Sequence, residues 1–273
     1  MRKLNIAIAQ IKSFHGECEK NLNKALKIIE KAAQNRSNII IFPELFYTGY
    51  FNKRKIFYEK AEYSNGYLYS KLKETAVKYN IAIIMGYCEM KKEFPDKYFN
   101  SLMFVDNKGK LLCSYNKIYC WKEEKKTFTE GKKLFVCETE FGKIGLLNCY
   151  DIEFPELFRI LHFKGAELVI CPSVWSKWIG HRWHSSLMAG AINNLFFVAG
   201  VNTVGSTPLG KDLCGDSKII SPFGDIVVNA SWDKEEIIYS SIDLDYVNKI
   251  REEYPIWDDY RHDMFDKLLL EKY

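Results

Sequence analysis

One cysteine stands where the sequence changes from a strand pattern to a helix pattern. The apolar run 143–149 ends at Asn148 and Cys149, and Pro155-Glu156 then begins a segment with apolar residues at helical spacing. Such a turn holds a side chain out over the edge of a sheet, and the N-terminus of the following helix favours a thiolate there. Cys149 is therefore a candidate nucleophile. A buried, inert thiol is the alternative, because that is the commoner fate of a free cysteine.

Two other stretches place charge beside apolar runs. Glu44 follows the buried-strand pattern of residues 38–42, so it is expected at the carboxyl edge of that strand, where open α/β sheets usually carry chemistry. Lys117 ends a predicted hairpin strand, and residues 118–133 behind it are dense in charge. An ordinary exposed loop acid and a solvated charged face are the alternative interpretations of these two stretches.

The histidines do not complete a metal site in the sequence. His181 and His184 have i,i+3 spacing and could share a metal, but no third histidine or carboxylate pattern accompanies them. We interpret both as helix-surface residues and expect no metal.

Composition excludes several classes of protein. The 273 residues are 47% hydrophobic, which suffices for a large core in one domain. The net charge of +4 comes from scattered lysines without a basic run, so a nucleic-acid partner is not expected. The eight cysteines show neither a CxxC pair nor metal-finger spacing, and no apolar run is long enough to cross a bilayer. A cytoplasmic location is expected.

Strand and helix signals alternate along the chain and predict an α/β protein with mixed sheets. A turn at 107–109 predicts a hairpin, which makes the sheet mixed rather than parallel. The segment 51–65 is expected to be mobile, and no core periodicity is evident beyond Asp245. The predicted strands are 4–11, 38–42, 81–87, 100–106, 110–115, 134–138, 143–149, 166–172, 195–204, two within 218–228, and 237–244, and the predicted helices are 19–34, 68–77, one from 155, and 182–194.

Three motifs together resemble the nitrilase superfamily of carbon–nitrogen hydrolases. They are the stretches 42–50 (FPELFYTGY), 115–119 (YNKIY) and 148–156 (NCYDIEFPE), in this order and separation, and 215–224 (GDSKIISPFG) also looks like a late strand-turn-strand of that family. The resemblance implies a four-layer α-β-β-α sandwich. It assigns residues 1–253 to the hydrolase domain, and 254–273 are expected to be a C-terminal arm that packs on a second subunit.

The resemblance also implies roles for individual residues. Glu44 matches the general base, Lys117 the catalytic lysine and Cys149 the nucleophile. A second glutamate of the lysine loop falls at Glu124, with Glu123 as the alternative. The predicted substrate-binding residues are the backbone N–H of Tyr150, which with Lys117 would bind the oxyanion, and the side chains of Tyr50, Glu153 and Trp175.

The implied reaction is hydrolysis of a small-molecule amide or N-carbamoyl amine through a cysteine thioester, without a cofactor. Cys149-Tyr150-Asp151 is similar to the amidase branches, whereas true nitrilases more often carry Cys-Trp-Glu. A nitrilase that hydrolyses nitriles and a non-catalytic protein with the same fold remain the alternatives. The family commonly associates through helices beside the cysteine, so at least a homodimer is expected.

Two positions depart from the amidase pattern. Many relatives have arginine where this chain has Glu153, and glutamate where it has Asn193. If Glu153 faces the pocket, it would favour neutral or cationic substrates over anionic ones. If it only complements the N-terminus of the following helix, it has no effect on substrate choice.

Overall fold

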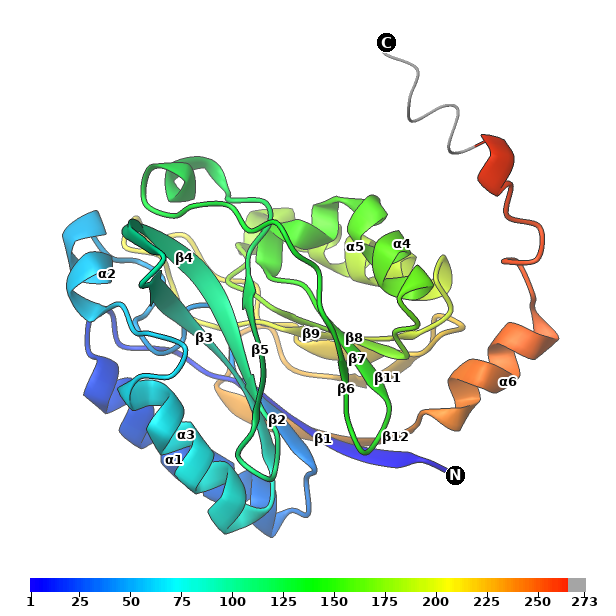
Figure 1. Ribbon diagram of the computed structural model, residues 1–273, viewed down its shortest axis with the longest axis horizontal. Helices are drawn as coiled ribbons and strands as arrows, with labels where there is room; N and C mark the ends of the chain where they lie inside the picture. The colour runs from blue at the N-terminus through cyan, green and yellow to red at the C-terminus, as the bar shows by residue number, and fades with distance from the viewer. Residues whose placement is uncertain (265–273) are drawn as a thin grey trace.

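Two β-sheets packed face to face, with helices on both outer sides, give the protein four layers (Figure 1). The computed structural model describes residues 1–264. Each sheet has six strands and is mixed, in the orders β12-β1-β2-β3-β4-β5 and β11-β10-β9-β8-β7-β6. The expected α-β-β-α sandwich with mixed sheets is confirmed, including the hairpin that closes the first sheet.

The first sheet combines parallel strands at its centre with antiparallel strands at its edges. β1 pairs with β2 and β2 with β3 in parallel, whereas β4, β5 and β12 run antiparallel to their neighbours. The strands are β1 (Lys3–Gln10), β2 (Ile39–Ile41), β3 (Ala82–Lys91), β4 (Phe94–Val105), β5 (Leu111–Asn116) and β12 (Glu236–Asp243).

The second sheet repeats this plan. β7, β8 and β9 are parallel, and β6, β10 and β11 add antiparallel edges. The strands are β6 (Val136–Glu138), β7 (Lys143–Leu146), β8 (Leu168–Pro172), β9 (Phe197–Val201), β10 (Lys218–Ile220) and β11 (Ile226–Asn229).

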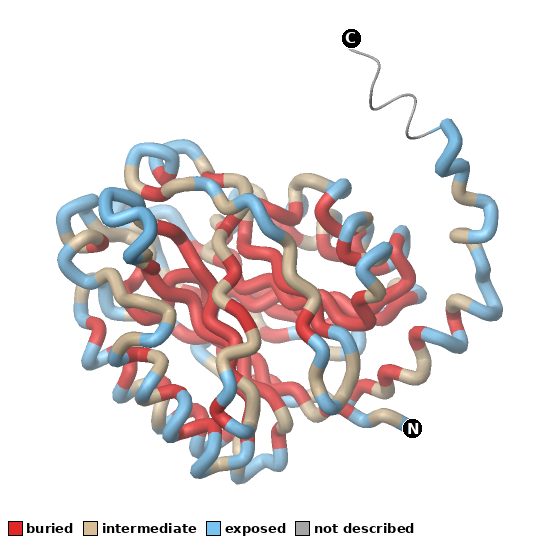
Figure 2. Tube along the Cα trace, in the orientation of Figure 1, coloured by how far each residue is buried: buried red, intermediate tan, exposed pale blue. Residues whose placement is uncertain are grey.

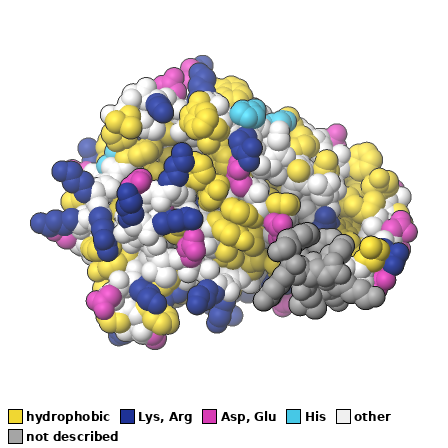
Figure 3. Space-filling model, turned by 90° about the horizontal axis from the view of Figure 1, so that it is seen from above, with side chains coloured by type: hydrophobic (Ala, Val, Ile, Leu, Met, Phe, Trp, Pro, Cys, Tyr) yellow, Lys and Arg dark blue, Asp and Glu magenta, His cyan; other side chains and the backbone are white. Residues whose placement is uncertain are grey.

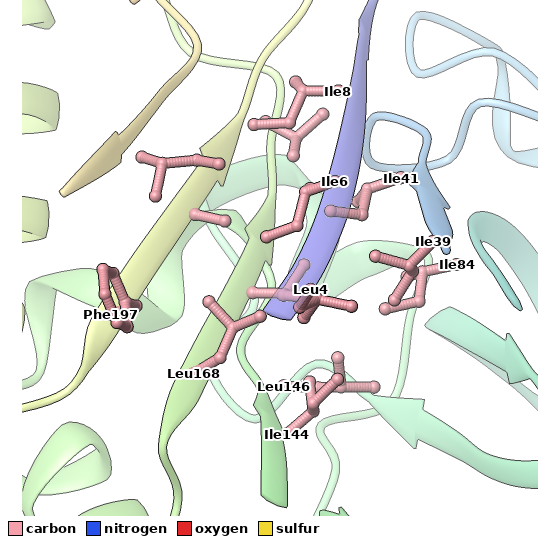
Figure 4. Packing of buried hydrophobic residues seen from close by; sticks show 14 of the residues in the cluster. Leu4, Ile6, Ile8, Ile39, Ile41, Ile84, Ile144, Leu146, Leu168 and Phe197 are labelled. Carbon is pink, nitrogen blue, oxygen red and sulfur yellow. The ribbon is translucent and has the colours of Figure 1, made fainter. Parts of the chain in front are cut away.

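The largest core cluster lies between the two sheets, because alternate side chains of each strand point inward. Leu4 and Ile6 of β1 meet Leu168 of β8 across this layer (Figure 4). Two further clusters lie under the helices, and buried residues accordingly run along the strands and the inner helix faces (Figure 2). The central strands of each sheet have one face on the layer between the sheets and the other face under the helices. They are therefore buried on both faces, which explains their continuous apolar sequences.

Amphipathic helices cover the outer faces. The first sheet is covered by α1 and α3, and the second by α4 and α5. In α1 the apolar residues Leu22, Ala25 and Ile29 are buried, as their spacing predicts. The bounds are α1 (Cys18–Gln34), α3 (Tyr67–Tyr79), α4 (Pro155–Phe163) and α5 (Gly180–Ile192).

Two helices lie where the sequence indicated none. α2 (Arg54–Lys60) occupies the segment expected to be mobile, and α6 (Asp245–Glu253) follows the last strand. α2 buries only Phe57, which packs edge-on against Phe128. α6 buries only Val247 and Ile250. One buried residue in α2 shows no period, and the i,i+3 pair of α6 is too short a pattern to predict a helix by itself.

The chain after α6 packs on its own α4. The ring of Trp257 stacks on His162 with ring centroids 4.0 Å apart, and the guanidinium of Arg159 lies 3.9 Å from its ring centroid. The predicted arm, 254–273, therefore has contacts within the chain as far as the structure describes it. Residues 265–273 lie outside the described residues. No helix within residues 1–264 is long and apolar enough to cross a membrane.

Gly86 of β3 supports the turn that carries Glu44. A methyl group at this position would lie 2.3 Å from the backbone nitrogen of Leu45 and 2.6 Å from the carbonyl oxygen of Pro43. Only glycine lets this turn approach the strand so closely.

We predict that Gly86→Ala lowers kcat for the hydrolysis that the family resemblance implies about 100-fold. The added methyl group displaces the backbone of the turn and moves the Glu44 carboxylate by a fraction of an ångström or more. Gly145→Ala in β7 is the matched control, since a methyl group there meets only side-chain atoms of Leu161 and Val169. Steady-state kinetics of the two folded variants, with circular dichroism to confirm folding, makes the comparison. Equal kcat in both variants would contradict this role of Gly86.

Candidate active site

Three side chains at the ends of strands meet in the interior between the two sheets. Glu44 follows β2, Lys117 follows β5, and Cys149 follows β7. Glu124 joins them from a short 3₁₀ turn, η1 (Lys122–Lys126), in the charged loop. The structure thus brings together all four residues that the sequence indicated as catalytic candidates.

The ammonium of Lys117 is the centre of this cluster. Its Nζ atom lies 2.6 Å from Glu44 Oε1 and 2.9 Å from Glu124 Oε2, and the lysine side chain is fully buried. Burial alone would lower the pKa of Lys117, but the charges of Glu124 and Glu44 outweigh it and raise that pKa well above its usual value. Lys117 is therefore a fixed positive charge and not a proton donor near neutral pH.

The carboxylate of Glu44 is oriented by hydrogen bonds to both oxygens. Asn100 Nδ2 donates to Oε1 at 2.7 Å, and the backbone N–H of Val174 donates to Oε2 at 3.1 Å. Asn148 Nδ2 in turn donates to Asn100 Oδ1 at 2.9 Å. Burial, partly offset by Lys117, raises the pKa of Glu44. A buried carboxylate with a raised pKa and a hydrogen bond to Cys149 suits proton transfer near neutral pH.

The structure distinguishes the two glutamates of the charged loop. Glu124 is buried, and it accepts hydrogen bonds from Tyr50 Oη at 2.6 Å and from the backbone N–H of Trp121 at 2.8 Å. Glu123 points outward, and its side chain is 81% exposed and pairs with Lys126. Only Glu124 of the two contacts Lys117.

Cys149 occupies the turn predicted for it, but its thiol is not set up as a resting thiolate. Its φ of 53° is in the left-handed region, and this strained backbone conformation places Sγ 3.9 Å from the carbonyl oxygen of Val174. Burial and the nearby Glu44 carboxylate raise the pKa of the Cys149 thiol well above its usual value. The expected stabilisation of a thiolate by the helix N-terminus is outweighed by desolvation, so the resting group is the thiol.

A buried aspartate joins the cysteine turn to the lysine loop. Asp151 Oδ2 accepts hydrogen bonds from Tyr115 Oη at 2.6 Å and from the backbone N–H of Asn148 at 3.0 Å, and its Oδ1 accepts one from the backbone N–H of Tyr119 at 2.8 Å. Asp151 therefore ties the positions of Lys117 and Cys149 together.

A pocket of about 500 Å³ opens in front of Cys149. Three predicted substrate-binding residues, Tyr50, Tyr150 and Trp175, line it, and further aromatic walls come from Phe51, Trp121 and Trp178. Seen from the side of the η1 loop, apolar side chains gather in the middle of the molecular face, with lysines and arginines mostly to one side (Figure 3). The pocket therefore suits a small organic substrate.

Glu153 also lines the pocket, but its charge is not free. Arg182 of α5 donates from Nε to Oε1 at 2.8 Å and to Oε2 at 3.1 Å, and its Nη2 pairs with Oε2. The Glu153 side chain is 12% exposed, whereas that of Arg182 is 54% exposed. Glu153 thus faces the pocket as a paired charge, because a guanidinium from another element neutralises it. The expected preference for neutral or cationic substrates stays a prediction.

Sequence reasoning missed Asn100, Asp151 and Arg182 as members of the site. Asp151 lies within the recognised cysteine motif, so its position could have marked it. Asn100 lies on β4 and Arg182 on α5, elements other than those that carry the carboxylates they bind, and only the folded chain brings them to the site.

The histidine interpretation was right for His181 and incomplete for His184. His181 is exposed on α5 beside the pocket, whereas the Nδ1 of the half-buried His184 lies 3.0 Å from Lys218 Nζ. Residues 1–264 contain no group of three or more potential ligands that could hold a metal ion.

We predict that Asp151→Asn changes the pH dependence of stability. Burial raises the pKa of Asp151 to about 6, above the unfolded value of about 3.9. Its contribution to stability is therefore present below about pH 4 and is lost as the pH rises through about 6. The asparagine variant lacks this titration, and its oxygen cannot replace both carboxylate acceptors.

Urea unfolding at pH 5 and 7.5 measures the effect. The variant should be the less stable protein at pH 5, and the gap to wild type should narrow by about 1–2 kcal/mol at pH 7.5. Asp96→Asn, at an exposed position of β4, is the control for loss of a carboxylate. A gap that stays constant with pH would show that Asp151 does not titrate in this range.

Comparison with known proteins places this geometry in a family. The family model described as "Carbon-nitrogen hydrolase" matches residues 5–252. The chain is 30% identical to an Omega-amidase NIT2 of Xenopus tropicalis, over 97% of this chain and 98% of the relative. It is 31% identical to a 2-oxoglutaramate amidase of Bacillus subtilis, over 96% of this chain and 100% of the relative.

A solved structure agrees with the family match. The crystal structure of a carbon-nitrogen hydrolase from Helicobacter pylori G27 superposes with a TM-score of 0.90 at 26% identity, covering 99% of each chain. The match in sequence and fold thus extends over nearly the whole chain. The protein belongs to the carbon–nitrogen hydrolase family, the nitrilase superfamily, and is an amidohydrolase.

Proposed function

We propose that Glu44, Lys117, Glu124 and Cys149 hydrolyse the amide of a small carboxylic acid to the acid and ammonia through a thioester on Cys149. The observation that carries this proposal is the buried contact of Lys117 with both carboxylates beside the cysteine that lines the pocket. Such a cluster is costly to bury, so a role in chemistry accounts for it better than a role in stability.

In the first step the Cys149 thiol attacks the amide carbon. Because the pKa values of Cys149 and Glu44 are both raised, the carboxylate takes the thiol proton as the sulfur–carbon bond forms. The resulting oxyanion is stabilised by the Lys117 ammonium and by the backbone N–H of Tyr150. One such donor contributes about 3 kcal/mol to transition-state binding in other hydrolases.

In the second step the tetrahedral intermediate collapses to the thioester. Protonated Glu44 gives its proton to the leaving nitrogen, which departs as ammonia. Glu44 then takes a proton from water as that water attacks the thioester carbon. The second collapse releases the acid and returns the proton to the Cys149 sulfur, so both groups are restored.

Glu124 acts on the geometry of these steps. It contacts Lys117 and accepts the Tyr50 hydroxyl, so it fixes the ammonium between two carboxylates and joins it to the pocket wall. The reaction rate depends strongly on the relative positions of the reacting groups, and a small displacement of one group lowers the rate. We assign Glu124 to positioning of Lys117 and of the amide group beside it.

We predict different results for the two glutamates. Glu44→Gln removes the base and should abolish acylation, as Cys149→Ala should through loss of the nucleophile. Glu124→Gln retains base and nucleophile, so a slowed reaction with an accumulating acyl-enzyme is expected. Intact-mass spectrometry with substrate detects that species, and Glu123→Gln, at the exposed neighbouring position, is the matched control. Full activity of Glu124→Gln would remove Glu124 from the mechanism.

The pocket also indicates which amides are favoured. Glu153 engages Nε and Nη2 of Arg182, which leaves the Nη1 donors of a half-exposed guanidinium at the pocket wall. A guanidinium binds carboxylates well because its donors match their geometry. Together with the relative described as a 2-oxoglutaramate amidase, whose substrate carries a carboxylate, this supports an ω-amide with a free acid group.

We predict that kcat/KM is highest for the anionic member of a series of small primary amides ending in carboxylate, methyl or ammonium. Arg182→Gln should lower kcat/KM for the anionic amide about tenfold to a hundredfold and leave the methyl-ended amide nearly unchanged. Lys55→Gln removes an exposed charge elsewhere and controls for long-range attraction. Ammonia release is the assay.

The same assay tests the alternatives. The matched nitriles should release no ammonia, because the amidase relatives and the Cys149-Tyr150-Asp151 motif favour amides. A preference for the ammonium-ended amide would instead mean that the negative charge of Glu153 determines which substrates bind. Turnover of none of these compounds would overturn the proposal that the substrate is a small primary amide.

We also propose a homodimer in the cytoplasm. Ile160 and Phe163 of α4, Trp178 beside α5 and Phe223 are large apolar side chains that the chain leaves at least 41% exposed. Exposed apolar surface of this kind marks an interface in many proteins. All eight cysteines are free, which fits a reducing compartment.

A further inference from the structure

Two cysteines that the active site does not use face each other across the sandwich. Cys113 lies on β5, the edge strand of the first sheet, and Cys137 lies on β6, the edge strand of the second. Their Sγ atoms are 3.2 Å apart. Both are buried in the core between the sheets, with 6% and 7% of each residue exposed.

The two cysteines bracket the segment that carries half of the catalytic cluster. Lys117 and Glu124 both lie between residues 113 and 137 in the chain. The segment returns on itself, because the backbone N–H of Gly131 donates to the carbonyl oxygen of Lys117 at 2.7 Å. A bond between Cys113 and Cys137 would therefore close the base of this loop.

We propose that Cys113 and Cys137 are an oxidisable pair, which a hydroperoxide converts to an intramolecular disulfide that joins the two sheets beneath the catalytic loop. The pair is a site of covalent modification separate from the nucleophile Cys149. It does not depend on the substrate or on the proposed mechanism.

The chemistry requires one two-electron oxidant. The thiolate of Cys137 attacks one peroxide oxygen, which breaks the O–O bond and gives a sulfenic acid and hydroxide. The thiol of Cys113 then attacks this sulfur, so the S–S bond forms and the sulfenic oxygen leaves as water with the proton of Cys113. In sum, two thiols lose two electrons and two protons, and one hydrogen peroxide becomes two water molecules.

The environment assigns the order of these steps. The hydrogen bond with Cys113 lowers the pKa of Cys137, while the same interaction, followed by burial, raises the pKa of Cys113. Thiolate is the reactive form, so the lowered pKa favours Cys137 as the first to react, and the disulfide that forms is the same whichever thiol reacts first. Most other buried cysteines have no such partner, and burial raises the pKa of Cys88 and Cys120 instead.

The position on edge strands permits the approach that a bond needs. Within the described sheets β5 pairs only with β4, and β6 pairs only with β7. The β4–β5 ladder also changes register between Phe104 and Val105, opposite Cys113. Strands held on one side can shift more easily than central ones, and the two sulfur atoms must close by only a little over 1 Å to bond.

Peptide mapping of the full chain tests the proposal. Trypsin cleavage gives peptides 111–117 and 134–143, each with one cysteine. After limited hydrogen peroxide and blocking of free thiols, a non-reducing digest of wild type should contain these two peptides joined and lighter by two hydrogen atoms. Dithiothreitol should separate them. A digest without the joined pair, or one that joins either peptide to a different cysteine, would overturn the proposal.

A stability measurement separates a specific bond from general oxidation. In a Cys149→Ser background, which protects the active site from oxidation, peroxide should raise the thermal unfolding midpoint, and dithiothreitol should reverse the rise. Adding Cys113→Ser or Cys137→Ser should abolish the rise, whereas adding Cys18→Ser, at a buried cysteine of α1, should not. A rise that survives loss of either partner would contradict the pairing even if amidase activity is as proposed.

Discussion

The buried ion cluster around Lys117 is the constraint that the rest of the structure must satisfy. One ammonium and two carboxylates lie together with almost no exposure to water. Desolvation makes such a cluster costly unless each charge is paired and hydrogen-bonded. Asn100, Tyr50 and the backbone N–H groups of Val174 and Trp121 supply those bonds. These polar groups thus serve to hold the three charges in place.

The double sheet makes the cluster possible. Glu44 and Lys117 come from the first sheet, and Cys149 comes from the second, so neither sheet holds the reacting groups alone. The apolar layer between the sheets sets the distance between Cys149 and Glu44, and Asp151 adds a polar tie between the two loops. A core of close-packed side chains is rigid enough to hold that distance. Packing between the sheets therefore sets the geometry of the candidate site.

Electrostatics in the folded chain changes what individual residues do. On a turn in isolation, Cys149 would be a candidate thiolate, but burial beside Glu44 makes it a thiol that needs a base. Glu153 alone would place an unpaired negative charge at the pocket wall, but the guanidinium of Arg182 pairs with it. Both changes arise because a charge's neighbours in space, and its exposure to water, outweigh its neighbours in sequence.

Periodicity and turn chemistry predicted an α/β protein with mixed sheets and the succession of most strands and helices, because burial patterns are written in adjacent residues. The resemblance of three motifs to a known family supplied the four layers and the candidates Glu44, Lys117, Glu124 and Cys149. The sequence did not indicate α2 or α6, because one or two buried residues are too short a pattern to predict a helix. It placed the second glutamate at Glu124 with Glu123 as the alternative, but it did not find Asn100 or pair Glu153 with Arg182. Only the tertiary structure decided these points, since the burial of a side chain and the partners that it contacts depend on how separate elements pack together.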